Sequence, residues 1–382
     1  MPVDVVWRGR LRDSSAPPPP APSGAFIELN ATTPTALSYN GQDLYLRGTN
    51  FNNLPALGLW QTPDITKIKT NLAYYELLAS MGANHTRFGL SQPWWEQSRN
   101  QFFDVLDQHI AWAKQNSLWV LLNNFVLPDN IYEAYGGSPY AAGGIFWTDA
   151  GLQERFTNYC VDLADHFANE PVVCGYDLLN EPGAPDNTTW FNYAQYLRDQ
   201  MYTVDQNHLV IIETRSGGQF WHIFNGDNIV YSHHMYSPQG LTHSSSGTSA
   251  VYPGWYTEWD NNSHYFSKDT MNAKTDTATG NPWDNLTDLQ NRYCIKWGRD
   301  VGVPVLVGEW GAREYVPGRI DYIRDVGELF TQWNLHSSHF QFVASASYNF
   351  CLFNENTLAP YYPSLVTVME DLWAGSLRPS FA

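Results

Sequence analysis

The sequence is poor in charge. Only 15% of its 382 residues are charged, and 21 Lys and Arg stand against 38 Asp and Glu, which gives a net charge of −17. An acidic surface disfavours nucleic acid and anionic lipid as binding partners. Apolar runs are also short: none reaches the roughly 18 residues that a membrane-spanning helix needs. We therefore expect neither a nucleic-acid-binding nor a membrane protein.

Cysteine is scarce as well. The four cysteines, at positions 160, 174, 294 and 351, form no CxxC pair, so they offer no thiolate metal site. Free thiols and one or two disulfides both remain open. The adjacent pair His233 and His234 is a poor metal site too, because successive strand residues point to opposite faces. We expect no metal and no cofactor.

The N-terminus lacks the apolar segment of a signal peptide. It contains instead the stretch APPPPAPSG (16–24), which favours a stiff polyproline linker. We expect residues 1–24 to be a disordered or linker segment and residues 25–382 to form a single domain. A secreted protein would need a signal that the given sequence does not contain.

Aromatic residues are abundant, with 16 Trp and 23 Tyr. At 43% hydrophobic residues the chain can bury a large core, and part of the tryptophan belongs there. Aromatic rings also combine an apolar face with a polar tip, which suits the CH-rich faces of sugar rings. The composition therefore admits both a tryptophan-rich core and a carbohydrate-binding surface.

Apolar runs alternate with amphipathic stretches from about residue 40 to the end. We expect eight strands, at 44–51, 84–90, 118–125, 172–180, 209–214, 229–236, 303–309 and 340–347. We expect helices at 64–81, 101–116, 151–168, 190–205, 217–225, 285–300, 319–334 and 363–374. Many of these strands are almost continuously apolar, as parallel strands are. Eight βα units predict a (β/α)8 TIM barrel, and a doubly wound sheet is the alternative.

Two long connections follow strands in this reading. Residues 126–150 come after the third strand, and residues 237–284 come after the sixth. Long connections at the carboxyl ends of barrel strands are where binding loops occur. We expect both to lie on the face that carries the functional site.

Two strands end in glutamate. The fourth ends in Leu179-Asn180-Glu181-Pro182, and the seventh contains Glu309 in VLVGEWGA. Strand ends followed by polar and turn residues are common, so either glutamate alone means little. In a closed barrel, however, the two would face each other across the mouth. Carboxylates about 5 Å apart can cleave a glycosidic bond with retention of configuration.

Such a pair needs two different protonation states. The acid/base must hold a proton near neutral pH, which burial and a negative neighbour favour. The nucleophile must stay ionised, and Arg87 at the end of the second strand can supply the positive charge. A purely structural salt bridge is an equally good reading of Arg87 by itself. Pro182 ends regular strand pairing and should hold Glu181 in an extended conformation.

These motifs resemble glycoside hydrolase family 5, the cellulase family of retaining TIM-barrel enzymes, over residues 40–375. LRGTN (46–50) is similar to the family's first-strand signature. The resemblance implies that Glu181 is the acid/base, Glu309 the nucleophile and Asn180 the donor to the sugar 2-hydroxyl. It further implies that the remaining polar residues support these groups: Arg87 and Tyr236 the nucleophile, and His234, from YSHHMYSP, the acid/base.

Two positions depart from the family pattern. The third strand usually ends in histidine, whereas VLLNNF places Asn123, Asn124 and Phe125 there, with Asn124 as the candidate site residue. The eighth strand usually carries a tryptophan, for which Tyr348 is the candidate substitute. We also expect tryptophans on the loops of the catalytic face to stack on sugars; the candidates are Trp94, Trp95, Trp147, Trp190, Trp255, Trp259 and Trp310.

The resemblance predicts a secreted, monomeric enzyme that hydrolyses β-1,4-linked polysaccharide, with an endo-β-1,4-glucanase as the favoured activity. Its substrate would be a polysaccharide or oligosaccharide. A β-mannanase or another β-glycanase or exo-glycosidase of the family is an alternative, because one hydroxyl contact separates gluco from manno specificity. A carbohydrate-binding barrel with impaired catalysis is a further alternative, in view of the two departures.

Overall fold

The structure of the chain is a computed structural model. It describes residues 25–51, 72–126, 144–215, 222–245, 249–257, 263–272, 295–314, 316–344 and 350–381. The linker expected over residues 1–24, and with it one boundary of the expected domain division, lies outside the described residues.

Eight parallel strands close into a barrel, in the spatial order β12-β13-β4-β5-β6-β7-β8-β9. Their bounds are β4 (Arg47–Phe51), β5 (His85–Ser91), β6 (Trp119–Val126), β7 (Val173–Asp177), β8 (Leu209–Glu213), β9 (Ile229–Met235), β12 (Val305–Trp310) and β13 (His336–His339). The predicted TIM barrel is confirmed. Each strand feeds a crossover that returns to the next strand, so all carboxyl ends meet at one mouth.

The eighth strand was predicted in the wrong place. It is β13, His336–His339, rather than the apolar stretch 340–347. The four residues HSSH are all buried, and two of them have polar partners. His336 Nδ1 accepts the backbone N–H of Leu46, and Ser338 Oγ lies 2.7 Å from His85 Nε2. Hydrophobic periodicity therefore missed a strand whose burial rests on hydrogen bonds.

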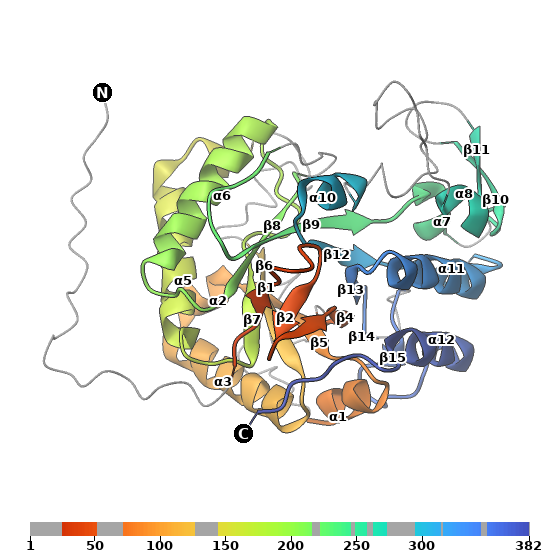
Figure 1. Cartoon of the computed structure of the whole chain (residues 1–382), viewed down its shortest axis with the longest axis horizontal. Coiled ribbons are helices and arrows are strands. Elements are labelled where there is room, and N and C mark those ends of the chain that lie inside the picture. Colours follow the sequence, from red (N-terminus) through yellow and green to blue (C-terminus); the bar gives the residue numbers. More distant parts are fainter. Residues whose placement is uncertain are drawn as a thin grey trace, which may run out of the picture.

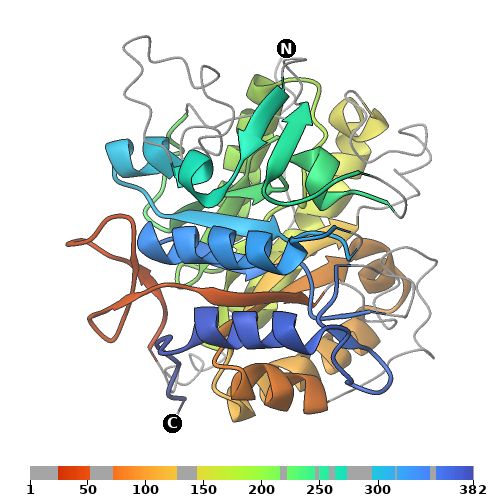
Figure 2. The same ribbon diagram turned by 90° about the vertical axis from the view of Figure 1, so that its right-hand side faces the viewer.

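Helices surround the barrel. In Figure 1, α3 (Arg99–Gln115), α5 (Ala150–Phe167) and α6 (Asn187–Tyr202) cover one side, and α11 (Arg319–Gln332) and α12 (Pro363–Trp373) cover the other. Figure 2 shows α11 and α12 side by side. Shorter helices include α1 (Leu72–Ser80), α2 (Gln92–Gln97) and α10 (Ile295–Val301). None of the described helices has the length and apolar character that crossing a bilayer requires.

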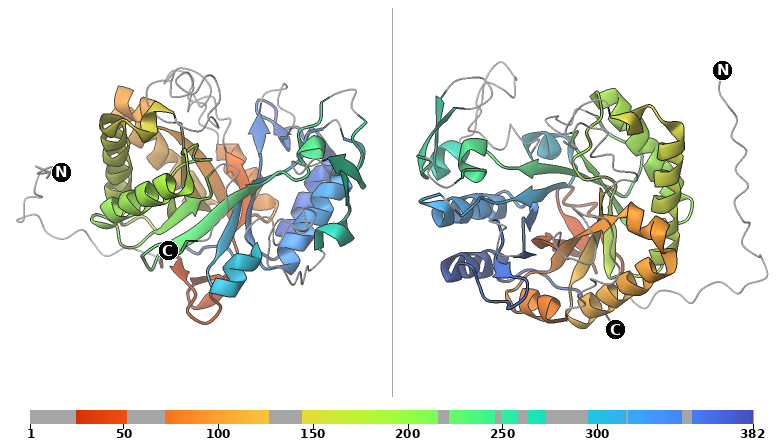
Figure 3. Two further views of the ribbon diagram at one scale, coloured as in Figure 1. Left: turned by 90° about the horizontal axis from the view of Figure 1, so that it is seen from above. Right: turned by 180° about the vertical axis from the view of Figure 1, so that it is seen from behind.

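The amino end of the barrel is closed by an antiparallel sheet of β1 (Glu28–Leu29), β2 (Leu37–Tyr39) and β3 (Gln42–Leu44). Leu37, Tyr39 and Leu44 join barrel-interior residues such as Leu121 and Ile211 in one buried cluster. The left view of Figure 3 places this sheet at the end of the barrel away from α7 (Gln239–Thr242). The interior at this end is therefore packed mainly with apolar side chains, and the charged groups lie at the carboxyl ends.

The connection after the sixth barrel strand carries structure of its own. It contains α7, the hairpin of β10 (Gly254–Thr257) and β11 (Ser263–Phe266), and α8 (Lys268–Asn272). The connection after the third strand has one described element, the 3-10 helix η3 (Ile145–Trp147). Residues 127–143 of the first expected loop, and residues 246–248, 258–262 and 273–284 of the second, lie outside the described part of the chain.

Candidate active site

Arg87 is the centre of a buried polar cluster at the barrel mouth. It sits on β5 with a fully buried side chain, and its five N–H donors meet five acceptors. Nε donates to Asp177 (2.8 Å), and the two terminal nitrogens donate to four further residues: Asn50 (2.8 Å), Glu309 (3.0 Å), Asn180 (2.9 Å) and Glu213 (2.7 Å). Burial opposes its charge, but the carboxylates outweigh burial and raise the pKa of Arg87.

The guanidinium fixes the orientation of two side-chain amides. Because it can only donate, the atoms of Asn50 and Asn180 that face it must be oxygens. The amide nitrogen of Asn50 then donates to the backbone carbonyls of Gly308, Ser338 and His339, which ties the first, seventh and eighth strands together. The amide nitrogen of Asn180 points away from Arg87 and is available as a donor.

A β-bulge aims Glu309 into the mouth. On β12, Leu306 faces the barrel interior and Val307 faces the helices, so regular alternation would send Glu309 outward. The strand register shifts between Val307 and Glu309, which resets the alternation. Gly308 permits this close approach, because a Cβ there would lie 3.0 Å from His234 Nε2.

Glu309 has a hydrogen-bond donor on each oxygen. Arg87 donates to Oε1 (3.0 Å), and the hydroxyl of Tyr236 donates to Oε2 (2.9 Å). We expected these donors to hold its pKa low. Burial instead raises the pKa of Glu309 above its ordinary value, with Glu181 and Glu213 adding to the effect, while His234 and Arg87 act in the opposite direction.

Glu181 does not have the extended backbone that Pro182 led us to expect. β7 ends at Asp177, and at Glu181 φ is +44°, in the left-handed region. That region is rare for a residue with a side chain and is further disfavoured before proline. Two hydrogen bonds accompany this conformation. Asn180 N–H donates to the backbone carbonyl of Asn124 (2.9 Å), and Glu181 N–H donates to Glu213 Oε2 (2.7 Å).

His234 lies between three carboxylates. Nδ1 is 2.8 Å from Glu181 Oε1 and 3.6 Å from Glu309 Oε2, and Nε2 is 3.1 Å from Glu213 Oε1. Burial opposes protonation, but the charges of Glu213 and Glu309 raise the pKa of His234 well above 6.5. Each ring nitrogen faces a carboxylate oxygen. Burial would raise the pKa of Glu213, yet the bonds from His234 and Arg87 lower it to about 2.

The two catalytic candidates come close together. One oxygen of Glu181, one oxygen of Glu309 and a ring nitrogen of His234 all lie within 4.8 Å of one another. This is the short carboxylate spacing that we expected from the strand positions. The Glu309 side chain is 6% exposed and that of Glu181 is 19% exposed, so both are shielded but reachable from the mouth.

The same three groups are close enough to share a cation. A metal ligand needs a ring-nitrogen lone pair, and both ring nitrogens of His234 already lie within hydrogen-bond distance of carboxylate oxygens. The two histidines of the pair separate as the alternation predicts: His234 faces the mouth, and His233 is buried on the other side of β9. Burial lowers the pKa of His233 to about 3.

Several expected sugar-binding residues are placed elsewhere by the structure. Asn124 faces outward, where its amide donates to the Leu178 carbonyl (3.1 Å) and lies against Cys160, because the alternation turns Asn123 inward instead. Trp310 follows the bulge and is buried against Phe330. Neither residue reaches the mouth with its side chain.

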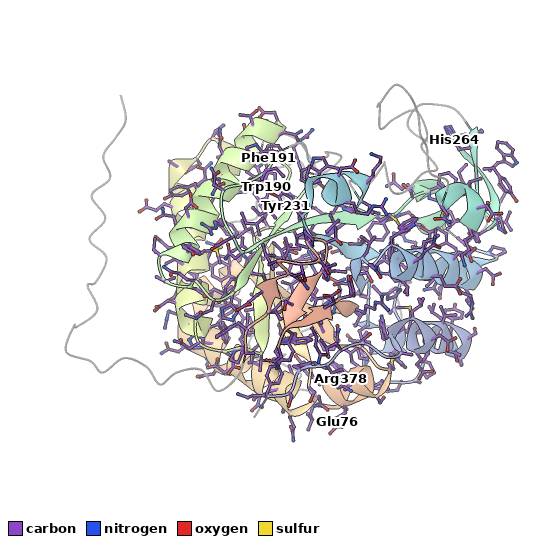
Figure 4. The ribbon with its side chains drawn as sticks, viewed as in Figure 1. Glu76, Trp190, Phe191, Tyr231, His264 and Arg378 are labelled. Atoms are coloured by element: carbon purple, nitrogen blue, oxygen red, sulfur yellow. The ribbon has the colours of Figure 1, made fainter. Side chains whose placement is uncertain are left out.

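The other tryptophans are mostly packing residues. Trp190 of α6 is fully buried and donates to the Glu213 carbonyl (2.7 Å), and Trp147 packs edge-on against it. Figure 4 shows Trp190 among the side chains between α6 and the barrel. Trp94 is also buried and Trp95 is half-buried. Trp255 of β10 is 69% exposed, whereas Trp259 and Tyr348 lie outside the described residues.

Sequence reasoning missed three members of the cluster: Asn50, Asp177 and Glu213. Each ends or nearly ends a barrel strand, in RGTNF, VCGYD and LVIIE. Their position could have identified them, because a polar residue at the carboxyl end of a barrel strand lies at the mouth. Among the described cysteines, Cys160, Cys174 and Cys351 are free and buried.

A (β/α)8 barrel with a buried arginine, a histidine and two close glutamates at its mouth has the architecture of a glycoside hydrolase. The sequence pattern of cellulase (glycosyl hydrolase family 5) matches residues 37–339. The chain belongs to this family.

Curated relatives agree with this assignment. Endoglucanase 3 of Fibrobacter succinogenes is 23% identical over 378 residues, which cover 86% of this chain and 54% of that protein. Endoglucanase C of Acetivibrio thermocellus is 24% identical over 205 residues, covering 47% of this chain and 57% of that protein. The chain thus matches only about half the length of these relatives.

Solved structures share the fold. A hyperthermophilic endo-β-1,4-glucanase crystallised with substrate superposes with a TM-score of 0.60 at 18% identity, covering 86% of this chain and 97% of that chain. Cel5A of Thermotoga maritima with mannotriose gives a TM-score of 0.59 at 18% identity, covering 85% of this chain and 97% of that chain.

Proposed function

We propose that the chain is a retaining endo-β-1,4-glucanase in which Glu309 is the nucleophile and Glu181 the acid/base. The observation that carries the proposal is the separation of the two carboxyl groups, with oxygens within 4.8 Å. Retaining glycosidases have carboxyl groups about 5 Å apart because one of them must reach the anomeric carbon directly. Inverting enzymes need a wider gap for a water molecule.

The hydrogen bonds support the division of roles. Glu309 has a donor on each oxygen, from Arg87 and Tyr236, which orients it for attack. It would form an ester bond to the anomeric carbon as the glycosidic C–O bond breaks. Glu181 would give its proton to the leaving oxygen, and would then take a proton from the water that hydrolyses the ester and frees Glu309.

Asn180 is placed to assist both steps. Arg87 holds its oxygen at 2.9 Å, so its amide nitrogen is turned away as a donor. We propose that this nitrogen binds the sugar 2-hydroxyl, where hydrogen bonds strengthen as the oxocarbenium-like transition state forms. His234 would guide Glu181, since its Nδ1 lies 2.8 Å from the Glu181 carboxylate.

We propose that the protein acts as a monomer, because Arg87, Glu181, His234, Tyr236 and Glu309 all come from one chain. A polymeric glucan does not enter cells, so the proposal also implies a secreted enzyme. Its net charge of −17 does not deter a neutral polysaccharide.

The test is a hydrolysis assay on soluble β-1,4-glucan, β-mannan and xyloglucan, with the anomer of the first product followed by NMR. We expect the glucan to be cut internally, with the β-anomer released first. Release of the α-anomer would contradict the retaining mechanism. Exclusive cleavage of mannan would replace the glucanase assignment with a mannanase, and inactivity on every substrate would favour a binding barrel.

A further inference from the structure

We propose that Glu213 is the positioning residue of the acid/base Glu181. The inference rests on the proposed function, in which Glu181 supplies the proton to the leaving oxygen. Glu213 is the last residue of β8 and is 1% exposed. Its carboxylate accepts the backbone N–H of Glu181 directly, and it reaches the Glu181 side chain through His234.

Every partner of the Glu213 carboxylate is a donor. Oε2 accepts the backbone N–H of Glu181 at 2.7 Å. Oε1 accepts Arg87 Nη2 at 2.7 Å and His234 Nε2 at 3.1 Å. An ionised carboxylate satisfies all of these donors, whereas an amide would turn an N–H2 group toward at least one of them.

The backbone contact with Glu213 can account for the unusual conformation of Glu181. A left-handed residue that precedes proline is strained, and such strain persists only where neighbouring groups hold it. The bond from Glu181 N–H to the Glu213 carboxylate is charge-assisted and short. Its strength is of the same order as the strain, so it can hold the conformation that turns Glu181 toward the mouth.

The side-chain contact runs through His234. Glu213 holds Nε2, which orients the ring, and Nδ1 then lies 2.8 Å from Glu181 Oε1. The Glu213 carboxylate therefore positions both the backbone N–H and the side-chain carboxylate of Glu181. The backbone of Glu213 is held in turn by Trp190, whose Nε1 donates to the Glu213 carbonyl at 2.7 Å.

The consequence for catalysis depends on the leaving group. A proton donor acts only within hydrogen-bond reach of the atom that it protonates. If Glu213 positions Glu181, its loss should slow the cleavage of bonds whose leaving oxygen needs a proton. Bonds to a leaving group that departs as an anion should be nearly unaffected. General loss of folded enzyme would lower both rates equally.

The experiment compares kcat/KM of Glu213→Gln on phenyl and 2,4-dinitrophenyl β-cellobioside. We expect a loss of about 100-fold on the phenyl substrate and less than about threefold on the dinitrophenyl substrate. The matched control is Asp177→Asn, which changes another fully buried carboxyl group bonded to Arg87, through Nε at 2.8 Å, but without a contact to Glu181. It should lower both rates by the same factor.

Glu213→Asp tests the same inference if the Glu213→Gln variant fails to fold. It keeps the charge opposite Arg87 and His234 but shortens the reach to Glu181 N–H, so it should show the same dependence on the leaving group. Equal losses on both substrates in a folded Glu213 variant, as in the Asp177→Asn control, would overturn the inference.

Glu181→Gln on the same two substrates separates the inference from the proposed function. If Glu181→Gln discriminates strongly between the leaving groups while Glu213→Gln does not, the positioning role is wrong and the acid/base assignment stands. If Glu181→Gln itself shows no discrimination, the proposed function fails.

Discussion

The hydroxyl of Tyr236 donates a 2.9 Å hydrogen bond to Oε2 of Glu309, although the two residues are 73 positions apart in the chain. Tyr236 follows the sixth barrel strand and Glu309 lies near the end of the seventh, and β9 and β12 are paired neighbours. Barrel closure therefore brings a neutral donor to the oxygen that Arg87 does not hold.

Tyr236→Phe should lower kcat by about 10- to 100-fold, because a hydrogen bond to a charged group stabilises by roughly 1.5–3 kcal/mol. KM should change little, since the hydroxyl faces the nucleophile. Steady-state kinetics on a soluble substrate measure both parameters. An unchanged kcat would show that this bond does not support the reaction.

Glu309→Gln should abolish turnover while substrate binding persists, because the amide keeps the shape of the side chain and cannot form the glycosyl ester. Calorimetry with a cello-oligosaccharide measures the binding, and a reducing-sugar assay measures the turnover. If the Glu309→Gln variant turned over substrate at the wild-type rate, Glu309 would not be the nucleophile.

Glu181→Ala should still form the glycosyl-enzyme from an aryl glycoside with a good leaving group, but should lose most activity on polysaccharide. Added azide should accelerate the slow second step, because a small anion needs no general base. Burst kinetics with and without azide report both steps. Equal losses on the two substrates without an azide effect would contradict the acid/base role.

His234→Gln should remove a pH-dependent part of the stability. Burial opposes its charge, but Glu213 and Glu309 raise its pKa in the folded state well above the unfolded value of 6.5. Its charge therefore contributes fully below pH 6.5, and the contribution is lost as pH rises through the folded pKa.

Urea unfolding of both proteins across this range measures the effect. The difference in unfolding free energy should be largest on the acid side of pH 6.5 and should shrink toward alkaline pH. A difference that grows with pH would show that His234 is neutral in the folded state.

Trp255→Ala should weaken binding to insoluble glucan without lowering turnover of a small aryl glycoside. Its ring is 69% exposed on the β10–β11 hairpin, whose place at the edge of the molecule is marked in Figure 4 by His264. A pull-down with insoluble glucan measures the binding. Tyr196→Ala is the matched control, because Tyr196 is 51% exposed on α6. If both substitutions weakened binding to insoluble glucan equally, Trp255 would have no specific role in that binding.

The sequence by itself determined the architecture and most of the residues proposed to act at the mouth. Apolar runs mark several of the barrel strands, such as LVIIE of β8 and VLVGEW of β12, so the positions of these strands follow largely from hydrophobicity. Glu181 and Glu309 could be found because they stand at strand ends, and a barrel brings those ends together. His234 and Tyr236 belong to the same set for the same reason, whereas Arg87 lies within β5 and reaches the mouth with its long side chain.

Only the tertiary structure decided what holds these groups in place. The bulge that aims Glu309 inward is a register shift between strands, and the left-handed turn at Glu181 is held by contacts from other strands. No local pattern near Glu213 states that it accepts the Glu181 N–H, since the two residues are 32 positions apart. Local propensity fixes which residues form strands, whereas register, bulges and buried hydrogen bonds arise between strands, and these decide which side chains meet.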